Sequence, residues 1–481
     1  MKNDFIFQKI VSFFPYDPNT EQSSAIHVLS GFLTATDHDI VLLIKGYAGT
    51  GKTTLLGAVV KMMDDLHQKV ILLAPTGRAA KVFAEYAGHS AFTIHKKIYR
   101  QKNSALPSHL AAVSPDSPVF MRAPNLHTDT LFIVDEASMI SNESPDRPVF
   151  GNGALLDDLI EYVYSGYHCR LILMGDSAQL PPVSLTESPA LNAEYLRRYH
   201  LQVTEIQLRQ VVRQQEDSGI LFNATHLRNT LDNRKTDVFP KIETRHFADI
   251  RPIEGVELID EIASTYGRDG IDNTIIICRS NKTTNSYNNG VRNRILYREE
   301  ELSSGDRLMI VKNNYYWGKE QDDIDFIANG EIVQVVRVRN SEEMCGFRFC
   351  NVRVRFIDYD MEMDCKILLD TLHSESPALS KEAGEKLYAA VAETYADVKL
   401  KSERIKMIRE DPYFNALQVK YAYAITCHKA QGGQWSNVFL DIGYVTNEML
   451  GEDFYRWLYT AITRATQRLY LVNFCPRIST N

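Results

Sequence analysis

The segment GYAGTGKTT, residues 46–54, constrains the fold more than any other part of the chain. Gly46 is followed, after four residues, by Gly51, Lys52 and Thr53, which is the spacing of a phosphate-binding P-loop. A short apolar run precedes the segment, and apolar residues at helical spacing follow it. The sequence therefore predicts a buried strand, a glycine-rich turn and a helix, which together bind a nucleoside triphosphate. A chance glycine-rich turn is the alternative.

The positions of this loop have distinct expected roles. Glycines allow backbone N–H groups to turn toward the β- and γ-phosphates, and the helix that follows adds the positive end of its dipole. Lys52 is expected to reach the terminal phosphates, and the Thr53 hydroxyl is expected to ligate Mg²⁺. The nucleotide-binding residues predicted in the loop are Gly46, Ala48, Gly49, Thr50, Gly51, Lys52, Thr53 and Thr54.

Length and composition limit the class of protein. A chain of 481 residues is too long for one hydrophobic core, so we expect two to four domains. The chain has no apolar run as long as a membrane span, and its start lacks the profile of a signal peptide. Seven cysteines without a CxxC pair indicate reduced thiols and a cytoplasmic protein. The net charge of −8 argues against a protein that coats nucleic acid, although a basic channel can cross an acidic body.

The order of patterns along the chain predicts an α/β fold with two parallel-sheet lobes. Strands are expected near 40–45, 70–74, 131–134 and 171–174, and in a second series at 274–278, 419–424, 438–441 and 469–472. Alternating residues after position 300 indicate a small antiparallel barrel or sheet, followed by a charged helical part at about 378–410. The expected division is 1–100 with 129–204 for the first lobe, 101–128 for an insert in it, 205–299 with 416–481 for the second lobe, and 300–415 for its insert.

Two further strand-to-loop elements carry candidate catalytic residues. The apolar strand at the start of LFIVDEAS ends in two acids, of which Asp135 is expected to hold Mg²⁺, mostly through water. Glu136 would orient and deprotonate the attacking water. In LILMGDSAQLPPV, Gln179 is a candidate contact of the γ-phosphate. The alternatives are an acidic strand end without function and a polar turn made rigid by two prolines.

Six motifs in order resemble those of superfamily 1 helicases. They are GYAGTGKT, APTGRAAK, IVDEASMI, GDSAQLPPV, TCHKAQGGQW and YTAITRA, and the resemblance covers the chain from about residue 20 to 472. The series is most similar to the RecD, Dda and Pif-type branch, which moves 5′ to 3′. The resemblance implies two RecA-like lobes that clamp one ATP and Mg²⁺. It also implies that the 300–415 insert has an SH3-like β part and that the 101–128 insert resembles a pin.

The resemblance also assigns nucleotide contacts outside the P-loop. Arg213 and Arg464 resemble two second-lobe arginines that reach the γ-phosphate. Negative charge develops on the transferring phosphoryl group, and a guanidinium stabilises it. The other implied contacts are Gln22 at the adenine edge, Gln431 and Gly432 beside the phosphates, and Gln434 at the ribose, where many relatives carry Glu.

Candidate nucleic-acid contacts come from both lobes. Thr76, Gly77 and Arg78 follow a strand and open a helix, whose N-terminus suits a backbone phosphate. The resemblance adds His95, Asn281, Lys282, Thr426, His428 and Lys429. In the pin-like insert, Phe120 and Met121 are candidate wedge residues that would stack on the last base pair of a fork. Ordinary packing or surface positions are the alternative for the histidines and for the two insert residues.

The function that the resemblance implies is an ATP-dependent DNA helicase that moves 5′ to 3′ on single strands. Its expected partners are single-stranded and forked DNA, with repair or recombination proteins as candidate protein partners and no membrane. The alternatives are an ATPase that remodels protein–DNA complexes without unwinding, an RNA helicase, and a P-loop kinase or structural switch. The acid pair and the second-lobe arginines argue against the kinase.

Overall fold

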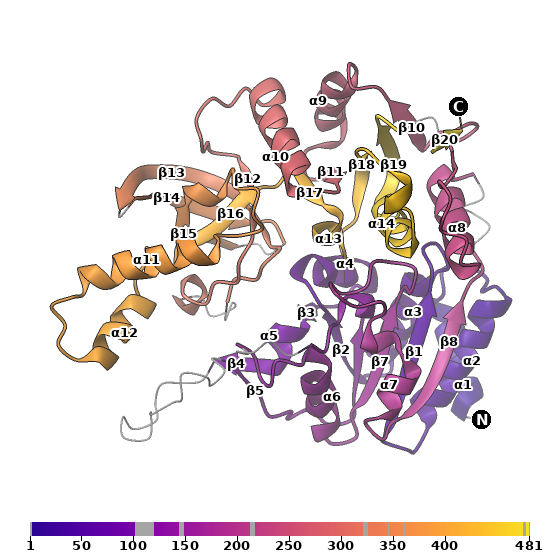
Figure 1. Ribbon diagram of the computed structural model, residues 1–481. Helices are drawn as coiled ribbons and strands as arrows, with labels where there is room; N and C mark the ends of the chain where they lie inside the picture. The colour runs from indigo at the N-terminus through magenta and orange to yellow at the C-terminus, as the bar shows by residue number, and fades with distance from the viewer. Residues whose placement is uncertain are drawn as a thin grey trace.

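The computed structural model describes residues 2–101, 120–143, 149–211, 217–320, 326–344, 346–358, 361–474 and 478–480. These residues form two domains with parallel sheets and a closed barrel that extends from the second domain (Figure 1). The predicted α/β class is therefore confirmed. Within the described residues, no helix is long and apolar enough to span a membrane.

The first domain contains a six-stranded sheet in which all neighbouring strands are parallel. Their order is β3-β2-β6-β7-β1-β8. The strands are β1 (Ile40–Gly46), β2 (Lys69–Ala74), β3 (Ala91–Thr93), β6 (Thr130–Val134), β7 (Arg170–Gly175) and β8 (Gln202–Leu208). The helices are α1 (Lys2–Phe13), α2 (Thr20–Thr34), α3 (Lys52–Asp65), α4 (Gly77–Ala87), α5 (Ile94–Ile98), α6 (Leu155–Ser165) and α7 (Ala193–Arg197). The four strands predicted in this lobe are all present.

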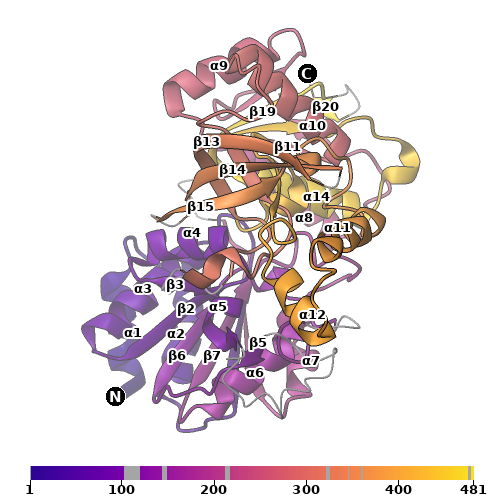
Figure 2. The ribbon, with the colours of Figure 1, turned by 90° about the vertical axis from the view of Figure 1, so that its left-hand side faces the viewer.

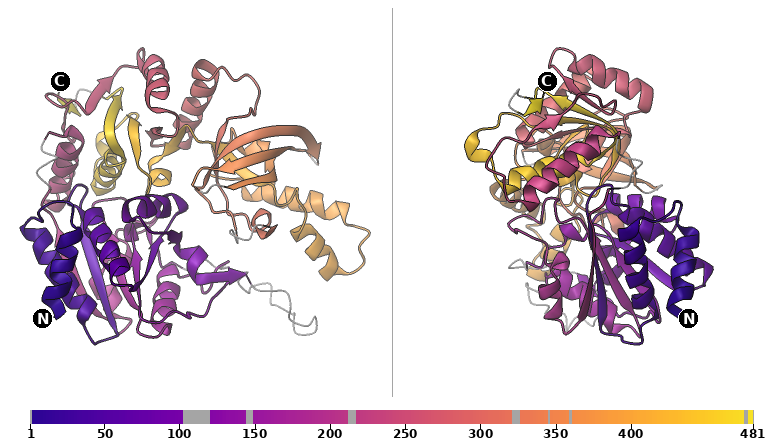
Figure 3. Two further views of the ribbon diagram at one scale, coloured as in Figure 1. Left: turned by 180° about the vertical axis from the view of Figure 1, so that it is seen from behind. Right: turned by 90° about the vertical axis from the view of Figure 1, so that its right-hand side faces the viewer.

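Alternate residues of β1 pack into two different cores. Leu42 and Ile44 join a core formed with α1, α2 and α3, whereas Val41 and Leu43 join a core formed with α5 and α6. Figure 3 shows the resulting sheet between two layers of helices. Burial on both faces explains why the sequence before the P-loop is continuously apolar rather than alternating.

The first domain extends further along the chain than we predicted. Strand β8 pairs with the whole of β1, from Ile40 opposite Gln202 to Gly46 opposite Leu208. The boundary expected at 204/205 therefore divides a strand of the first sheet. Strand β8 lies at the edge of the sheet, and its sequence mixes polar and apolar residues without a clear period, so it gives no sign of the lobe to which it belongs.

The second domain contains a five-stranded parallel sheet in the order β10-β19-β18-β11-β17. The strands are β10 (Ile250–Ile253), β11 (Thr274–Cys278), β17 (Ala424–Thr426), β18 (Trp435–Asp441) and β19 (Ala465–Val472). The helices include α8 (Gly219–Asp232), α9 (Leu258–Asp269), α10 (Asn281–Gly290), α13 (Cys427–Ala430) and α14 (Glu452–Ile462). A short parallel pair, β9 (Ile242–Glu243) with β20 (Ser479–Thr480), joins the end of the chain to this domain.

The insert of the second domain is a closed five-stranded barrel. It consists of β12 (Arg307–Ile310), β13 (Ile332–Met344), β14 (Phe347–Phe356), β15 (Met361–Leu368) and β16 (Leu417–Tyr421). Two helices, α11 (Lys381–Thr394) and α12 (Lys401–Arg409), precede the last strand and lie outside the barrel (Figure 2). The predicted boundary at 415 is wrong, because the apolar run expected to be one strand of the second lobe is two strands. β16 closes the barrel, and only β17 joins the parallel sheet.

The insert of the first domain is described only at its base. Strand β4 (Tyr99–Gln101) pairs with β5 (Phe120–Arg122), and residues 102–119 lie outside the described part. Phe120 is buried, and its ring centroid lies 5.1 Å from that of Tyr315 and 5.7 Å from that of Phe326, both in the barrel insert. Phe120 is therefore a packing residue between the two inserts and not an exposed wedge. Met121, at 46% exposure, is accessible.

Candidate nucleotide-binding site

The P-loop lies where β1 meets α3, at the carboxyl edge of the first sheet. Gly49 and Gly51 have φ of 76° and 84°, in the left-handed region that favours glycine, and Gly51 directly precedes α3. A cavity of about 350 Å³ opens beside the loop and is lined by both domains. The predicted residues that line it are Ala48, Gly49, Gly51, Lys52, Thr53, Thr54, Asp135, Glu136, Gln179, Gly432, Gln434 and Arg464.

Lys52 is held close to the loop. Its Nζ donates to the carbonyl oxygens of Gly46 at 2.6 Å and Tyr47 at 2.8 Å. A Cβ on residue 46 would lie 2.7 Å from Cγ of Lys52, so only glycine leaves room for the lysine stem. The ammonium group therefore lies at the cavity, where its N–H groups can donate hydrogen bonds to phosphate oxygens.

The two acids at the end of β6 differ in environment. The Asp135 carboxylate accepts hydrogen bonds from the backbone N–H of Glu136, at 2.7 Å, and from the Tyr86 hydroxyl. Glu136 has φ of 52°, which is uncommon for a residue with a side chain. Burial raises the pKa of Glu136 to about 7, although the positive charge of Arg464 opposes this. A carboxyl group with a pKa near neutrality suits a general base.

Gln179 presents an unsatisfied polar atom to the cavity. The side chain is 6% exposed, and its Oε1 is buried without a hydrogen-bond partner among the described residues. A buried acceptor of this kind is costly unless a donor reaches it. A water molecule beside the γ-phosphate is such a donor, so the environment of Gln179 fits a bound nucleotide.

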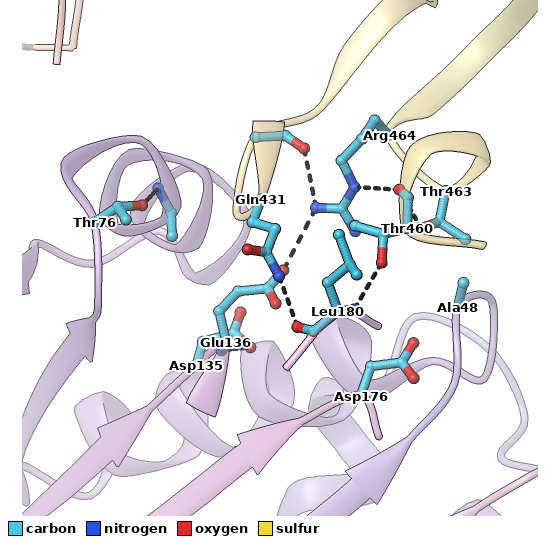
Figure 4. Close-up of polar contacts among 12 residues, drawn as sticks. Ala48, Thr76, Asp135, Glu136, Asp176, Leu180, Gln431, Thr460, Thr463 and Arg464 are labelled. Carbon is cyan, nitrogen blue, oxygen red and sulfur yellow. Dashed lines mark hydrogen bonds and ion pairs between the residues drawn. The ribbon is translucent and has the colours of Figure 1, made fainter. Parts of the chain in front are cut away.

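Arg464 reaches the site from the second domain. It is 2% exposed, and its guanidinium donates to the carbonyl oxygens of Thr460 at 3.0 Å and Gly433 at 3.2 Å. One Nη lies 3.8 Å from the Glu136 carboxylate across the cleft (Figure 4). The arginine is thus rigidly placed opposite the acid pair.

Hydrogen bonds join the two domains on each side of the cavity. Gln431 donates from Nε2 to the carbonyl oxygen of Leu180 at 2.7 Å, and the N–H of Leu180 donates to the Thr460 hydroxyl at 2.8 Å (Figure 4). The Tyr459 hydroxyl donates to Asp176 at 2.6 Å and accepts from the N–H of Ala48, in the P-loop, at 2.8 Å. The loop after β7 and the P-loop are therefore tied directly to α14.

Close packing between the domains also depends on Gly432. Its φ is 73°, and a Cβ there would lie 2.8 Å from Cβ of Ala79 on α4. Only glycine therefore brings this part of the second domain against α4. Gln434, which follows shortly after, is exposed at the mouth of the cavity.

Of the predicted nucleotide contacts, Gln22 has partners within the protein and Arg213 is not described by the structure. Gln22 is buried, accepts at Oε1 from the N–H of Asn19 at 3.0 Å, and donates to the carbonyl oxygen of Thr50 at 3.2 Å. It therefore caps α2 and anchors the P-loop, and both ends of its amide are occupied. Arg213 lies outside the described residues.

The predicted DNA contacts of α4 are engaged within the protein. The Thr76 hydroxyl caps the helix by accepting from the N–H of Ala79 at 3.2 Å. Arg78 donates to Asp358 of the barrel at 3.2 Å, and its guanidinium lies 5.1 Å from the ring centroid of Trp435. Arg78 is thus a contact between domains and is not free for a phosphate. Gly77 is buried at the start of the helix.

The other predicted DNA contacts fall into two groups. His95 is half-buried and packs against the rings of Tyr99 and Phe150, and burial lowers its pKa to about 4, which favours the neutral imidazole. The remaining candidates lie at or just after the carboxyl ends of β11 and β17, which are neighbouring parallel strands, so these residues share one edge of the second sheet. They are Asn281, Lys282, Thr426, His428 and Lys429, of which Lys282, His428 and Lys429 are exposed.

Sequence reasoning missed two tyrosines at the site. Tyr459 lies inside the YTAITRA motif, but nothing in the motif indicates that its hydroxyl contacts the P-loop. Tyr86 lies beyond the APTGRAAK motif. The helical spacing of Ala79, Val82 and Tyr86 could have indicated Tyr86, because the three residues share one face of α4 and all line the cavity.

The fold and the site define a P-loop protein with a nucleotide cavity between two parallel-sheet domains. Residues 18–239 match the family model described as an AAA domain, and residues 421–472 match the UvrD-like helicase C-terminal domain. The chain is 33% identical over 163 residues to the ATP-dependent RecD2 DNA helicase of Deinococcus radiodurans, covering 34% of this chain and 18% of that protein. It is 23% identical over 483 residues to the ATP-dependent DNA helicase dda of Enterobacteria phage T4, covering 95% of this chain and 100% of that protein.

A solved structure of the Pif1 helicase from Bacteroides, in complex with ADP-AlF3 and ssDNA, has 15% sequence identity and a TM-score of 0.45. The match covers 96% of this chain and 94% of that one. The two family models and the relatives agree with the ordered motifs. Together they support the assignment of the chain to superfamily 1B of the helicases, in the RecD, Dda and Pif-type branch.

Proposed function

We propose that the chain is an ATP-dependent DNA helicase that moves 5′ to 3′ along single-stranded DNA and separates the duplex. The observation that carries this proposal is the cavity between the domains, which places Arg464 of one domain against Glu136 of the other. Because the site is complete only when the domains meet, hydrolysis depends on closure. The names of the RecD2 and dda relatives support DNA as the substrate.

The residues at the cavity have complementary roles in hydrolysis. Lys52 exchanges its two carbonyl partners for phosphate oxygens. Thr53 and Asp135 would hold Mg²⁺, which supplies positive charge beside the β- and γ-phosphates. Glu136 accepts the proton of the attacking water, and Gln179 accepts a hydrogen bond from that water. Arg464 stabilises the charge that develops on the phosphoryl group.

The hydrogen bonds that cross the cleft couple this chemistry to domain movement. Loss of the γ-phosphate removes the ligand shared by both domains, and only protein contacts such as Gln431 to Leu180 then resist opening. Exposed residues after β11 and β17 in the second domain would hold the DNA backbone and release it as the domains move. The 5′ to 3′ direction follows the branch to which the chain is assigned.

The two inserts have proposed roles in separating the DNA strands. We infer that the five-stranded barrel is the SH3-like subdomain of this branch and that the β4–β5 pair is the base of the strand-separating pin. The rings of Phe120, Tyr315 and Phe326 would then keep the pin fixed against the barrel while the domains move. Forked DNA would be the natural substrate of such an arrangement.

ATP hydrolysis with different nucleic acids tests the proposal. The rate should rise on addition of single-stranded DNA and remain low with RNA of the same sequence or with no nucleic acid. Lys52→Ala should abolish hydrolysis in every case. Equal or greater stimulation by RNA would contradict DNA as the substrate, and hydrolysis indifferent to nucleic acid would contradict a helicase.

A further inference from the structure

The Tyr86 hydroxyl contacts a residue assigned above to Mg²⁺. It donates a hydrogen bond to Oδ2 of Asp135, which follows β6. Tyr86 itself lies on α4 and lines the same cavity as Thr53 at the start of α3. The phenol therefore connects α4 to the acidic strand end beside the P-loop helix.

The packing of α4 fixes the position of this hydroxyl. The Tyr86 ring lies 5.2 Å, centroid to centroid, from the ring of Phe83, which is fully buried in the core of the first domain. The packing of the ring against this core residue fixes its position on α4, and its hydroxyl contacts Asp135 at the cavity that Tyr86 lines.

The Asp135 carboxylate has a donor on each oxygen. Oδ1 accepts from the N–H of Glu136 at 2.7 Å, and Oδ2 accepts from Tyr86. Each carboxylate oxygen can accept more than one hydrogen bond, so both retain capacity for the water molecules of a hydrated cation. Two fixed donors prevent rotation of the carboxylate, and such support of a metal-binding carboxylate strongly affects metal affinity.

We propose that Tyr86 is a positioning residue of the Mg²⁺ site, which orients the Asp135 carboxylate for the metal. The proposal deepens the function proposed above and rests on its ATP site. Tyr86 does not touch the phosphates; it acts through Asp135, which would hold the cation. Removal of its hydroxyl therefore weakens the binding of the metal more than the binding of the nucleotide.

The test compares Tyr86→Phe with a matched control, Tyr164→Phe. Tyr164 lies in the same domain and donates to the carbonyl oxygen of Ile40 at 2.8 Å, so the control also removes a phenol hydrogen bond but not one in the cavity. Mn²⁺ binding in the presence of ADP is measured by electron paramagnetic resonance. We expect about 10- to 100-fold weaker Mn²⁺ binding for Tyr86→Phe and no change for the control.

Two further measurements separate this role from simple packing. The affinity for fluorescent ADP in EDTA should be unchanged in Tyr86→Phe, and hydrolysis at saturating Mg²⁺ should remain within a few-fold of the unmodified protein. Unchanged Mn²⁺ binding, or equal losses of ADP affinity with and without metal, would overturn the inference. Because metal binding with ADP requires neither DNA nor unwinding, a failure of the proposed helicase activity would be seen separately in the unmodified protein.

Discussion

Replacement of Glu136 by glutamine should stabilise the protein while it removes activity. The pKa of Glu136 is raised from 4.5 to about 7, because burial disfavours its charged form. The unfolded chain loses this proton near pH 4.5 and the folded protein near pH 7, so the folded state binds more protons between these values. Stability therefore falls as the pH rises through this window, by about 3 kcal/mol at 1.36 kcal/mol per pKa unit.

A glutamine at position 136 carries no charge and avoids this loss. Chemical unfolding without nucleotide, at pH 5, 6, 7 and 8, should show a stability gain in Glu136→Gln that grows with pH toward about 3 kcal/mol. Hydrolysis should fall by about 10²- to 10⁴-fold, because the general base is lost. The exposed Glu254 provides the control, since Glu254→Gln should change neither quantity. A gain that does not depend on pH, or a less stable variant, would contradict a raised pKa of the Glu136 carboxyl group in the folded protein.

Three other substitutions test separate parts of the structure. Arg464→Ala should lower hydrolysis by about 10³- to 10⁵-fold with nucleotide binding within a few-fold, and normal hydrolysis would contradict its placement at the cavity. Phe120→Ala should reduce the free energy of unfolding by about 3–5 kcal/mol, whereas Met121→Ala should change it by less than about 0.5 kcal/mol; equal losses in urea unfolding would contradict the difference in burial. Asp358→Ala leaves the α4 cations without their buried partner, so calorimetry should show a loss of about 1–3 kcal/mol, and an unchanged transition would mean that this contact does not form in solution.

The sequence predicted the parts of the site that depend on neighbouring residues. A P-loop needs only its glycines, one lysine, a preceding strand and a following helix, and all of these are local. The acid pair at the end of β6 and Gln179 after β7 were also found, because parallel strands bring their carboxyl ends to one edge. Arg464 needed the resemblance, since no local pattern shows that α14 faces the first domain.

Features that depend on distant partners were not predicted. Phe120 was predicted as a candidate wedge residue of the pin-like insert, but it packs against Tyr315 and Phe326, which lie about two hundred residues further along the chain. Arg78 lies in the first turn of a helix, and we therefore predicted that it binds a DNA phosphate. In the structure its charge is instead paired with that of Asp358 in the barrel. The apolar run that contains β16 and β17 fits a strand in either sheet, and only the tertiary structure decides between them.

ATP-driven directional movement on single-stranded DNA is the central activity proposed for this protein. The most direct test is ATP-driven unwinding of three short duplexes with the same base pairs: one with a 5′ single-stranded tail, one with a 3′ tail and one blunt. Lys52→Ala serves as the control without ATP hydrolysis. We expect unwinding of the 5′-tailed duplex alone, and none by the variant. Preference for the 3′ tail would contradict the direction, and ATP hydrolysis without opening of any duplex would contradict the helicase itself.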